Sequence, residues 1–254
     1  MSIGDPLAAM RRNMRAFYAL FGEFSPGGIL FQCDGVLAAI VPSCPDESIV
    51  NGVVYETADA LTARRDELEA AYREAGVRSW RVWVPDRAED AREVGEWLES
   101  RGHRLTATPR AMTLDLARAK IEPPDVDPAA EPSTDLRAVA SLNEQAYGLP
   151  DGQLTSALSG FAQDHVRVYL AHERDQPASC VVTVDADADC GIYAVATRPS
   201  SQGRGLASSL MRRALIEARD RGCRSSSLQA SPSGFPVYTR LGYRDVCAML
   251  VWER

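Results

Sequence analysis

The chain has 254 residues and a net charge of −7, with 45% hydrophobic and 25% charged residues. These values are ordinary for globular proteins, so a buried core is available, and the length suits two domains. The acidic balance argues against a nucleic-acid partner, which would need an excess of Lys and Arg. No run approaches the roughly 20 apolar residues of a membrane span, and Arg11, Arg12 and Arg15 interrupt the apolar region that a signal peptide would need. We therefore expect a cytoplasmic protein without a membrane partner.

The N-terminal half alternates helical and extended patterns. Apolar residues recur at helical spacing near the start, and Asp34-Gly35 separates two apolar runs as a hairpin turn would. We expect helices at residues 7–22, 57–75 and 86–101, and strands at residues 28–33, 36–41, 79–84 and 110–116. Residues 119–133 are rich in Pro, Ala and acidic residues, which predicts an interdomain linker.

The C-terminal half begins with a helix for which Ser133 or Thr134 is the expected N-cap. We expect helices at residues 134–147, 154–162, 203–221 and 234–240, and strands at residues 166–172, 178–184, 191–197, 225–229 and 243–253. The apolar periodicity of the long helix at residues 203–221 predicts that one face packs on a sheet.

The most distinctive stretch runs from Thr197 to Leu210 and reads Thr-Arg-Pro-Ser-Ser-Gln-Gly-Arg-Gly-Leu-Ala-Ser-Ser-Leu. A Gly-rich turn that opens a helix offers free backbone N–H groups and the positive end of the helix dipole, which together favour a phosphate or pyrophosphate. Gly203 and Gly205 carry no Cβ, so an anion can approach the backbone closely. The pattern predicts a phosphorylated cofactor.

Two common phosphate loops fit poorly. A Walker A loop needs Lys and then Ser or Thr after its last Gly, whereas Leu206 and Ala207 follow Gly205. A dinucleotide fingerprint needs Gly or Ala where Ser208 stands, and the roughly 50 remaining residues are too few for the second half of a doubly wound sheet.

A third loop fits better. Gln202-Gly203-Arg204-Gly205-Leu206-Ala207 resembles the acetyl-CoA loop of the GNAT acetyltransferase superfamily, Arg/Gln-x-x-Gly-x-Gly/Ala. Thr197-Arg198-Pro199 resembles the Val-x-Pro strand end of that family, and Tyr238-Thr239-Arg240-Leu241-Gly242-Tyr243 resembles its Tyr-x-x-Leu-Gly-Phe signature. The two main motifs stand at the family's spacing, with a helix and a strand expected between them.

The resemblance implies an α/β (α+β) fold, with a mixed, mostly antiparallel sheet flanked by helices, and a tandem organisation. Residues 134–254 would form the catalytic GNAT domain and residues 119–133 the linker. Residues 1–118 would form a degenerate GNAT-like domain, since their order of elements is faintly similar but the Gly loop is absent; an unrelated α/β cap is the alternative.

The resemblance also implies direct, acetyl-CoA-dependent N-acetylation of an amine through a ternary complex, without a metal. Tyr238 would be the general acid for the departing thiolate, because a phenol is protonated at neutral pH. The residues expected to bind acetyl-CoA are Val195, Ala196, Thr197, Gln202, Gly203, Arg204, Gly205, Leu206, Ala207, Ser208 and Ser231. Ser231 stands where many members of the family carry Asn.

The general base has no clear candidate, because no carboxylate occupies the expected strand positions. Glu144, an ordered water chain or bulk solvent remain open. For that reason an acetyl-CoA-binding sensor without efficient catalysis is the alternative function. The acceptor, a small molecule or a protein amino group, and the oligomeric state, monomer or homodimer, stay undecided.

Residues 185–189 are spaced like the start of a calcium loop. The sixth position is Cys190 instead of Gly, and the twelfth is Ala196 instead of Glu, so we expect the solvated turn of a β-hairpin. Six scattered cysteines without a Cys-x-x-Cys pair predict free thiols.

Overall fold

A computed structural model describes residues 5–124 and 133–254. Most of the predicted linker, residues 125–132, lies outside the described residues. The strands are β1 (Ile29–Cys33), β2 (Val36–Ile40), β3 (Gly52–Tyr55), β4 (Arg81–Pro85), β5 (Arg104–Ala107), β6 (Arg110–Asp115), β7 (Val166–Glu173), β8 (Gln176–Ala186), β9 (Asp189–Thr197), β10 (Ser225–Ala230) and β11 (Arg244–Glu253). The helices are α1 (Pro6–Phe24), α2 (Ala58–Ala63), α3 (Arg65–Glu74), α4 (Ala91–Ser100), α5 (Leu136–Tyr147), α6 (Gln153–Ala157), the short 3₁₀ helix η1 (Pro199–Ser201), α7 (Leu206–Asp220) and α8 (Phe235–Arg240).

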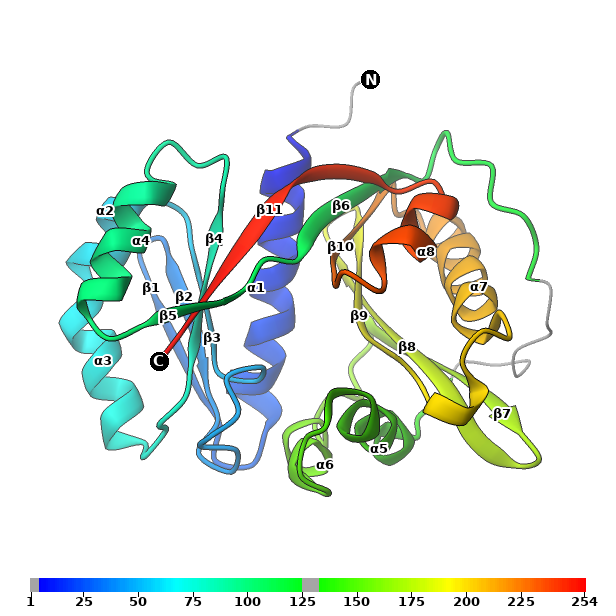
Figure 1. The fold of residues 1–254 in the computed structure, drawn as a ribbon, viewed down its shortest axis with the longest axis horizontal. Coiled ribbons are helices and arrows are strands. Elements are labelled where there is room, and N and C mark those ends of the chain that lie inside the picture. Colours follow the sequence, from blue (N-terminus) through cyan, green and yellow to red (C-terminus); the bar gives the residue numbers. More distant parts are fainter. Residues whose placement is uncertain (1–4, 125–132) are drawn as a thin grey trace.

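The described strands form one mixed sheet in the order β1-β2-β3-β4-β11-β6-β10-β9-β8-β7, with β5 beside β11 (Figure 1). Only the pairs β3–β4 and β9–β10 are parallel; the others are antiparallel. Helices α2, α3 and α4 cover one half of the sheet, whereas α7 and α8 cover the other half. This arrangement confirms the predicted fold class.

The two halves of the chain exchange strands. Strand β6 comes from the N-terminal half but pairs with β10 and β11 of the C-terminal half. Strand β11 pairs with β6 through residues 244–248 and with β4 through residues 249–253, so it crosses from one half of the molecule to the other (Figure 1). The backbone hydrogen bonds of both halves therefore depend on each other.

Helix α1 lies between the two halves (Figure 1). Asp5 caps it by accepting a hydrogen bond from the Leu7 amide at 3.0 Å, and Pro6 stands at the first helical position, which suits the fixed φ of proline. Its buried residues, Met10, Met14, Tyr18, Leu20 and Phe21, belong to the core that also includes α5, α6 and parts of β8 and β9. The predicted first helix therefore packs between the two halves and contributes to the core that they share.

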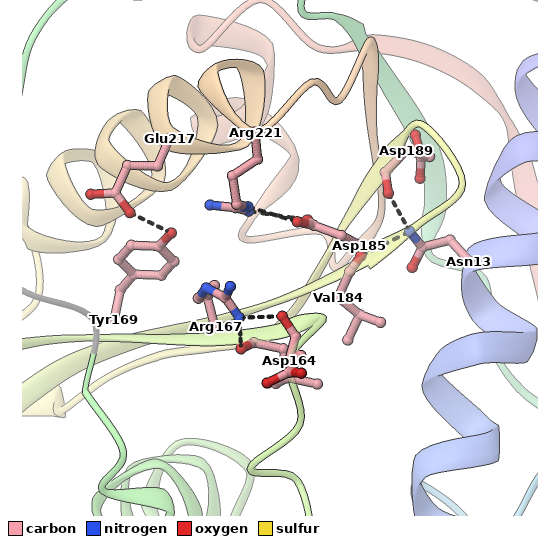
Figure 2. A network of polar contacts seen from close by, with 10 residues as sticks. Asn13, Asp164, Arg167, Tyr169, Val184, Asp185, Asp189, Glu217 and Arg221 are labelled. Atoms are coloured by element: carbon pink, nitrogen blue, oxygen red, sulfur yellow. Dashed lines mark hydrogen bonds and ion pairs between the residues drawn. The ribbon is translucent and has the colours of Figure 1, made fainter.

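A buried polar contact fixes α1 against the C-terminal half. Asn13 is fully buried, and its Nδ2 donates to the carbonyl oxygens of Val184 and Asp189, both at 3.0 Å (Figure 2). The Tyr193 hydroxyl donates to Asn13 Oδ1 at 2.9 Å. Gly191 leaves room for this contact, since a Cβ there would lie 1.9 Å from Asn13 Oδ1.

The structure corrects several predicted elements. The helix expected at residues 57–75 is two helices that meet at Arg64. Strands β3 and β5 were not predicted. Helix α5 is capped by Asp135, whose carboxylate accepts from the Ala138 amide at 2.9 Å, and not by Ser133 or Thr134. The Ser133 hydroxyl instead accepts from the amide of Asp135.

The segment at residues 185–189 is the turn of the β8–β9 hairpin, as predicted, but it is only partly solvated. Asp189 is 4% exposed, and its carboxylate accepts hydrogen bonds from the hydroxyls of Ser225 and Ser227, both at 2.6 Å. Burial raises the pKa of Asp189, and these hydroxyls oppose the rise. Asp185 pairs with Arg221 at the end of α7 (Figure 2).

Among the described residues, no group of His, Cys, Asp and Glu is arranged to hold a metal ion. All six cysteines are free thiols. None of the described helices combines the length and the apolar character needed to span a bilayer.

Candidate functional site

Strands β9 and β10 pair over only three residues each. The parallel ladder joins Asp189, Cys190 and Gly191 to residues 225–227. Beyond it, residues 192–197 of β9 pair on one side only, with β8, and residues 228–230 of β10 pair with β6. The second edge of β9 therefore offers unpaired backbone groups, to which an extended ligand can add as a strand does.

A β-bulge distorts β9 along this open edge. Ala194 has a φ of +48°, and the register with β8 shifts so that Ala194 and Val195 together oppose one residue of β8. The Ala194 carbonyl accepts from Cys180 Sγ at 3.2 Å and from Asn143 Nδ2 at 3.3 Å. Burial raises the pKa of Cys180 to about 12, so its thiol remains a donor. A strained non-glycine residue held by two donors is typical of functional sites.

The Gly loop leads directly into helix α7. Gly203 and Gly205 have φ of +76° and +78°, in the left-handed region that favours glycine. The helix begins at Leu206, and the Ser209 amide donates to the Gly205 carbonyl at 2.9 Å. The amides of residues 206–208 therefore precede the hydrogen-bonded part of the helix and point out of its positive end. This backbone geometry suits an anion, and the binding role of the loop stays a prediction.

Glu173, at the end of β7, holds the other side of the Gly loop. Its carboxylate accepts from the Ser201 hydroxyl at 2.6 Å and pairs with Arg204 at 2.9 Å and with Arg198 at 3.5 Å. The pKa of Glu173 is lowered, first by the Ser201 hydroxyl and then by Arg204. This anchor could not be predicted from the local pattern, because Glu173 lies about 30 residues before the loop.

Tyr238 lies on α8 and is 8% exposed. Its ring makes an edge contact with Tyr243, with centroids 5.9 Å apart, and a Cβ on Gly234 would lie 2.9 Å from it. Burial raises the pKa of Tyr238, so the phenol keeps its proton across the physiological range. Nearby, the Ser231 hydroxyl accepts from the Gly234 amide at 3.2 Å.

A single cavity of about 750 Å³ brings these parts together. All twelve residues that the sequence singles out for catalysis or cofactor binding line it. The remaining wall comes largely from elsewhere in the chain: α1, residues 49 and 50, β4 and residues 154–161. Residues of both halves therefore enclose one space.

The charged side chains that line the cavity are all arginines. Among the described residues that line it, the charged ones are Arg81, Arg204 and Arg240, and neither Asp nor Glu is present. Three of its tyrosines, Tyr18, Tyr193 and Tyr238, are buried, and burial raises their pKa values. Arginines beside a Gly loop complement a phosphorylated ligand.

Glu144 is not among the lining residues. It is 4% exposed, and its Oε1 accepts from the Leu154 amide at 2.8 Å, near the start of α6. Glu144 thus holds α6 in place, and the structure does not bring this candidate base to the cavity.

The individual residues of the N-terminal half that line the site were not identified from the sequence. The periodicity of residues 7–22 indicates only that one helix face is buried, not that Phe17 and Phe21 line a cavity. A signal did exist in β4. There the alternation places Arg81 and Trp83 on the face opposite Val82 and Val84, and this second face lines the cavity.

Comparisons with known proteins agree with this geometry. Residues 164–245 match the family model described as an acetyltransferase (GNAT) domain. No curated protein matches the chain. A GCN5-related N-acetyltransferase from Kribbella flavida superposes with a TM-score of 0.64 at 14% identity, covering 96% of this chain and 95% of that one.

Two further solved structures are similar. A putative GNAT acetyltransferase from Novosphingobium aromaticivorans gives a TM-score of 0.57 at 16% identity, covering 98% of this chain and 97% of that one. A tandem GNAT protein from the clavulanic acid biosynthesis pathway gives 0.58 at 14% identity, covering 86% and 78%. The chain therefore has the fold of the GCN5-related N-acetyltransferases, and its residues 164–245 match the GNAT acetyltransferase model.

Proposed function

We propose that this protein is an acetyl-CoA-dependent N-acetyltransferase that acts through a ternary complex. The observation that carries the proposal is the single cavity, which is lined by the Gly loop at the start of α7, the open edge of β9 and Tyr238. Each of these parts suits one section of the cosubstrate or one step of the transfer.

Acetyl-CoA would be held mainly by backbone groups. The amides of residues 203–208 are suited to the pyrophosphate, and each hydrogen bond to a charged acceptor contributes about 1.5–3 kcal/mol. Residues 195–197, on the unpaired edge of β9, are suited to the amide groups of the pantetheine arm. Arg240 adds a positive charge to the cavity lining.

The transfer needs little chemistry from side chains. The neutral amine nitrogen attacks the thioester carbonyl carbon; the N–C bond forms and the C–S bond breaks. The nitrogen loses one proton to solvent, and the departing thiolate takes one from Tyr238, which solvent then reprotonates. A backbone N–H beside the Ala194 bulge would stabilise the oxyanion.

We further propose a tandem organisation, with a catalytic domain at residues 134–254, a linker at residues 119–133 and a degenerate GNAT-like domain at residues 1–118. The similarity to a tandem GNAT protein over 86% of the chain supports it. The N-terminal domain would serve as the acceptor-side wall, since α1 and β4 line the cavity.

The test is the release of free CoA thiol from acetyl-CoA in the presence of a panel of primary amines, with the acetylated product identified by mass spectrometry. Turnover with any amine supports the enzyme. Tight binding of acetyl-CoA without turnover of any amine would favour a sensor instead, a role consistent with a cavity whose described lining residues include no carboxylate.

A further inference from the structure

Six of the aromatic residues that line the cavity come from α1, β4, β9 and residue 161. We call this group the aromatic wall: Phe17, Tyr18, Phe21, Trp83, Phe161 and Tyr193. Phe17, Phe21 and Phe161 contact one another edge to face or at a tilt, with centroids 4.6–6.0 Å apart. Phe17 and Trp83 are only half-buried, so ring surface remains available to a ligand. Flat apolar groups bind well to such surfaces, through stacked or edge contacts.

The charges of the cavity exclude several classes of amine. A polyamine or aminoglycoside carries further ammonium groups, but no Asp or Glu is found among the described lining residues. Arg81 offers little to an anionic substituent, because it already pairs with Glu253 at 2.7 Å and donates to the Ser48 hydroxyl at 2.8 Å. The wall therefore suits an acceptor with one amine and an uncharged body.

Asn143 marks where the nitrogen of such an acceptor would lie. Its Nδ2 donates to the carbonyls of Val139 at 2.8 Å and Ala194 at 3.3 Å, which fixes the orientation of the amide. No hydrogen bond among the described residues uses Asn143 Oδ1, although the residue lines the cavity. That oxygen can accept from an amine beside the Ala194 bulge.

We propose that the acceptor is a small arylalkyl primary amine, with its ring against the aromatic wall and its nitrogen at Asn143 Oδ1. This inference rests on the proposed acetyl transfer and names its substrate class. The aromatic surface favours the ring, and the absence of carboxylates among the described lining residues disfavours polycations. The apolar surroundings also favour the neutral, nucleophilic form of the amine.

The first experiment compares kcat/KM for phenethylamine, n-butylamine, glucosamine and spermidine at saturating acetyl-CoA. We expect phenethylamine to exceed glucosamine and spermidine by about a hundred-fold, because a site with apolar walls leaves their polar groups unpaired. Equal or better turnover of glucosamine or spermidine would overturn the proposal while leaving acetyl transfer intact.

Two variants test the contacts. Phe17→Leu should lower kcat/KM for phenethylamine about ten-fold, chiefly through KM, and change that for n-butylamine much less. Phe24→Leu is the matched control, because Phe24 ends the same helix, is 38% exposed and lies outside the cavity. Asn143→Leu should lower kcat/KM for every amine by a larger factor than it lowers the affinity for acetyl-CoA; equal losses of both would make Asn143 a support of β9 only.

Calorimetry separates the two proposals. Wild-type protein saturated with CoA should bind phenethylamine, and Phe17→Leu should weaken that binding. Absence of acetyl-CoA binding would defeat the proposed function itself. Binding of acetyl-CoA without any binding of phenethylamine to the CoA complex would defeat only the acceptor class.

Discussion

The ring of Phe17 stacks on the ring of Tyr193, with centroids 3.8 Å apart and planes within 1° of parallel. Phe17 belongs to α1 and Tyr193 to β9, next to the Ala194 bulge, so this contact joins the N-terminal helix to the strand expected to hold acetyl-CoA. The acceptor side of the cavity therefore depends on a helix more than 170 residues away in sequence.

Tyr238→Phe tests the general acid. Removing the hydroxyl while keeping the ring should lower kcat about ten-fold or more, because the thiolate would leave unprotonated. Calorimetric affinity for acetyl-CoA should hardly change, since the ring and its contact with Tyr243 persist. Unchanged turnover would remove Tyr238 from the mechanism.

The pH dependence of kcat/KM should follow the acceptor and not the enzyme. No described His, Asp or Glu lines the cavity, and the pKa of Tyr238 is raised, so no lining group titrates between about pH 5 and 8. Activity should rise with pH until the amine is neutral, and the midpoint should move when benzylamine replaces phenethylamine. A limb near pH 6–7 that is the same for both amines would reveal an enzymic base.

His103 should make the fold less stable in acid. It is 1% exposed, neither ring nitrogen has a hydrogen-bond partner among the described residues, and burial lowers its pKa to about 4. In the unfolded chain, His103 binds a proton near pH 6.5. The stability that the neutral, buried His103 contributes to the fold is therefore fully present above pH 6.5 and is lost as the pH falls toward 4.

The loss should reach roughly 2–3 kcal/mol by pH 4.5. Urea unfolding at pH 7.5 and 4.5 measures it, and His103→Phe should reduce the difference by that amount. The same pH difference in both proteins would show that His103 is not the cause.

Asn13→Leu tests the contact between α1 and the β8–β9 hairpin. It leaves the carbonyls of Val184 and Asp189 without their donor, so we expect a loss of about 3 kcal/mol in the free energy of unfolding. Tyr193→Phe is the milder comparison, because it removes one hydrogen bond and keeps the stack with Phe17. Equal effects of the two substitutions in urea unfolding would contradict the network.

The sequence predicted those features that follow from local patterns. The Gly loop, the helix after it and Tyr238 form a local motif, and the hairpin at Asp34-Gly35 follows from turn chemistry (φ of +76° at Gly35). The cofactor loop could therefore be predicted with its residues, although its binding role is still a prediction.

The exchange of β6 and β11, the aromatic wall and the Glu173 anchor could not be predicted in this way. Each depends on which distant segments pair, and periodicity shows only that a face is buried. Ala194 looks like any strand residue in the sequence, because its positive φ is imposed by contacts with Cys180 and Asn143. The sequence predicts that Asp189 is a solvated turn residue, because the serines that bind its carboxylate, Ser225 and Ser227, lie 36 and 38 residues further along the chain.

The most direct test of the account is calorimetric titration with acetyl-CoA of the wild-type protein, Gly205→Glu and Gly222→Glu. Gly205 and Gly222 lie at opposite ends of α7, with φ of +78° and +101° and open space around both, so each substitution strains the backbone and only Gly205 adjoins the expected pyrophosphate. We predict a Kd on the order of micromolar for the wild type and Gly222→Glu, and no measurable binding for Gly205→Glu. A wild-type protein that does not bind acetyl-CoA, or a Gly205→Glu variant that binds it as well as the wild type does, would contradict the proposed site.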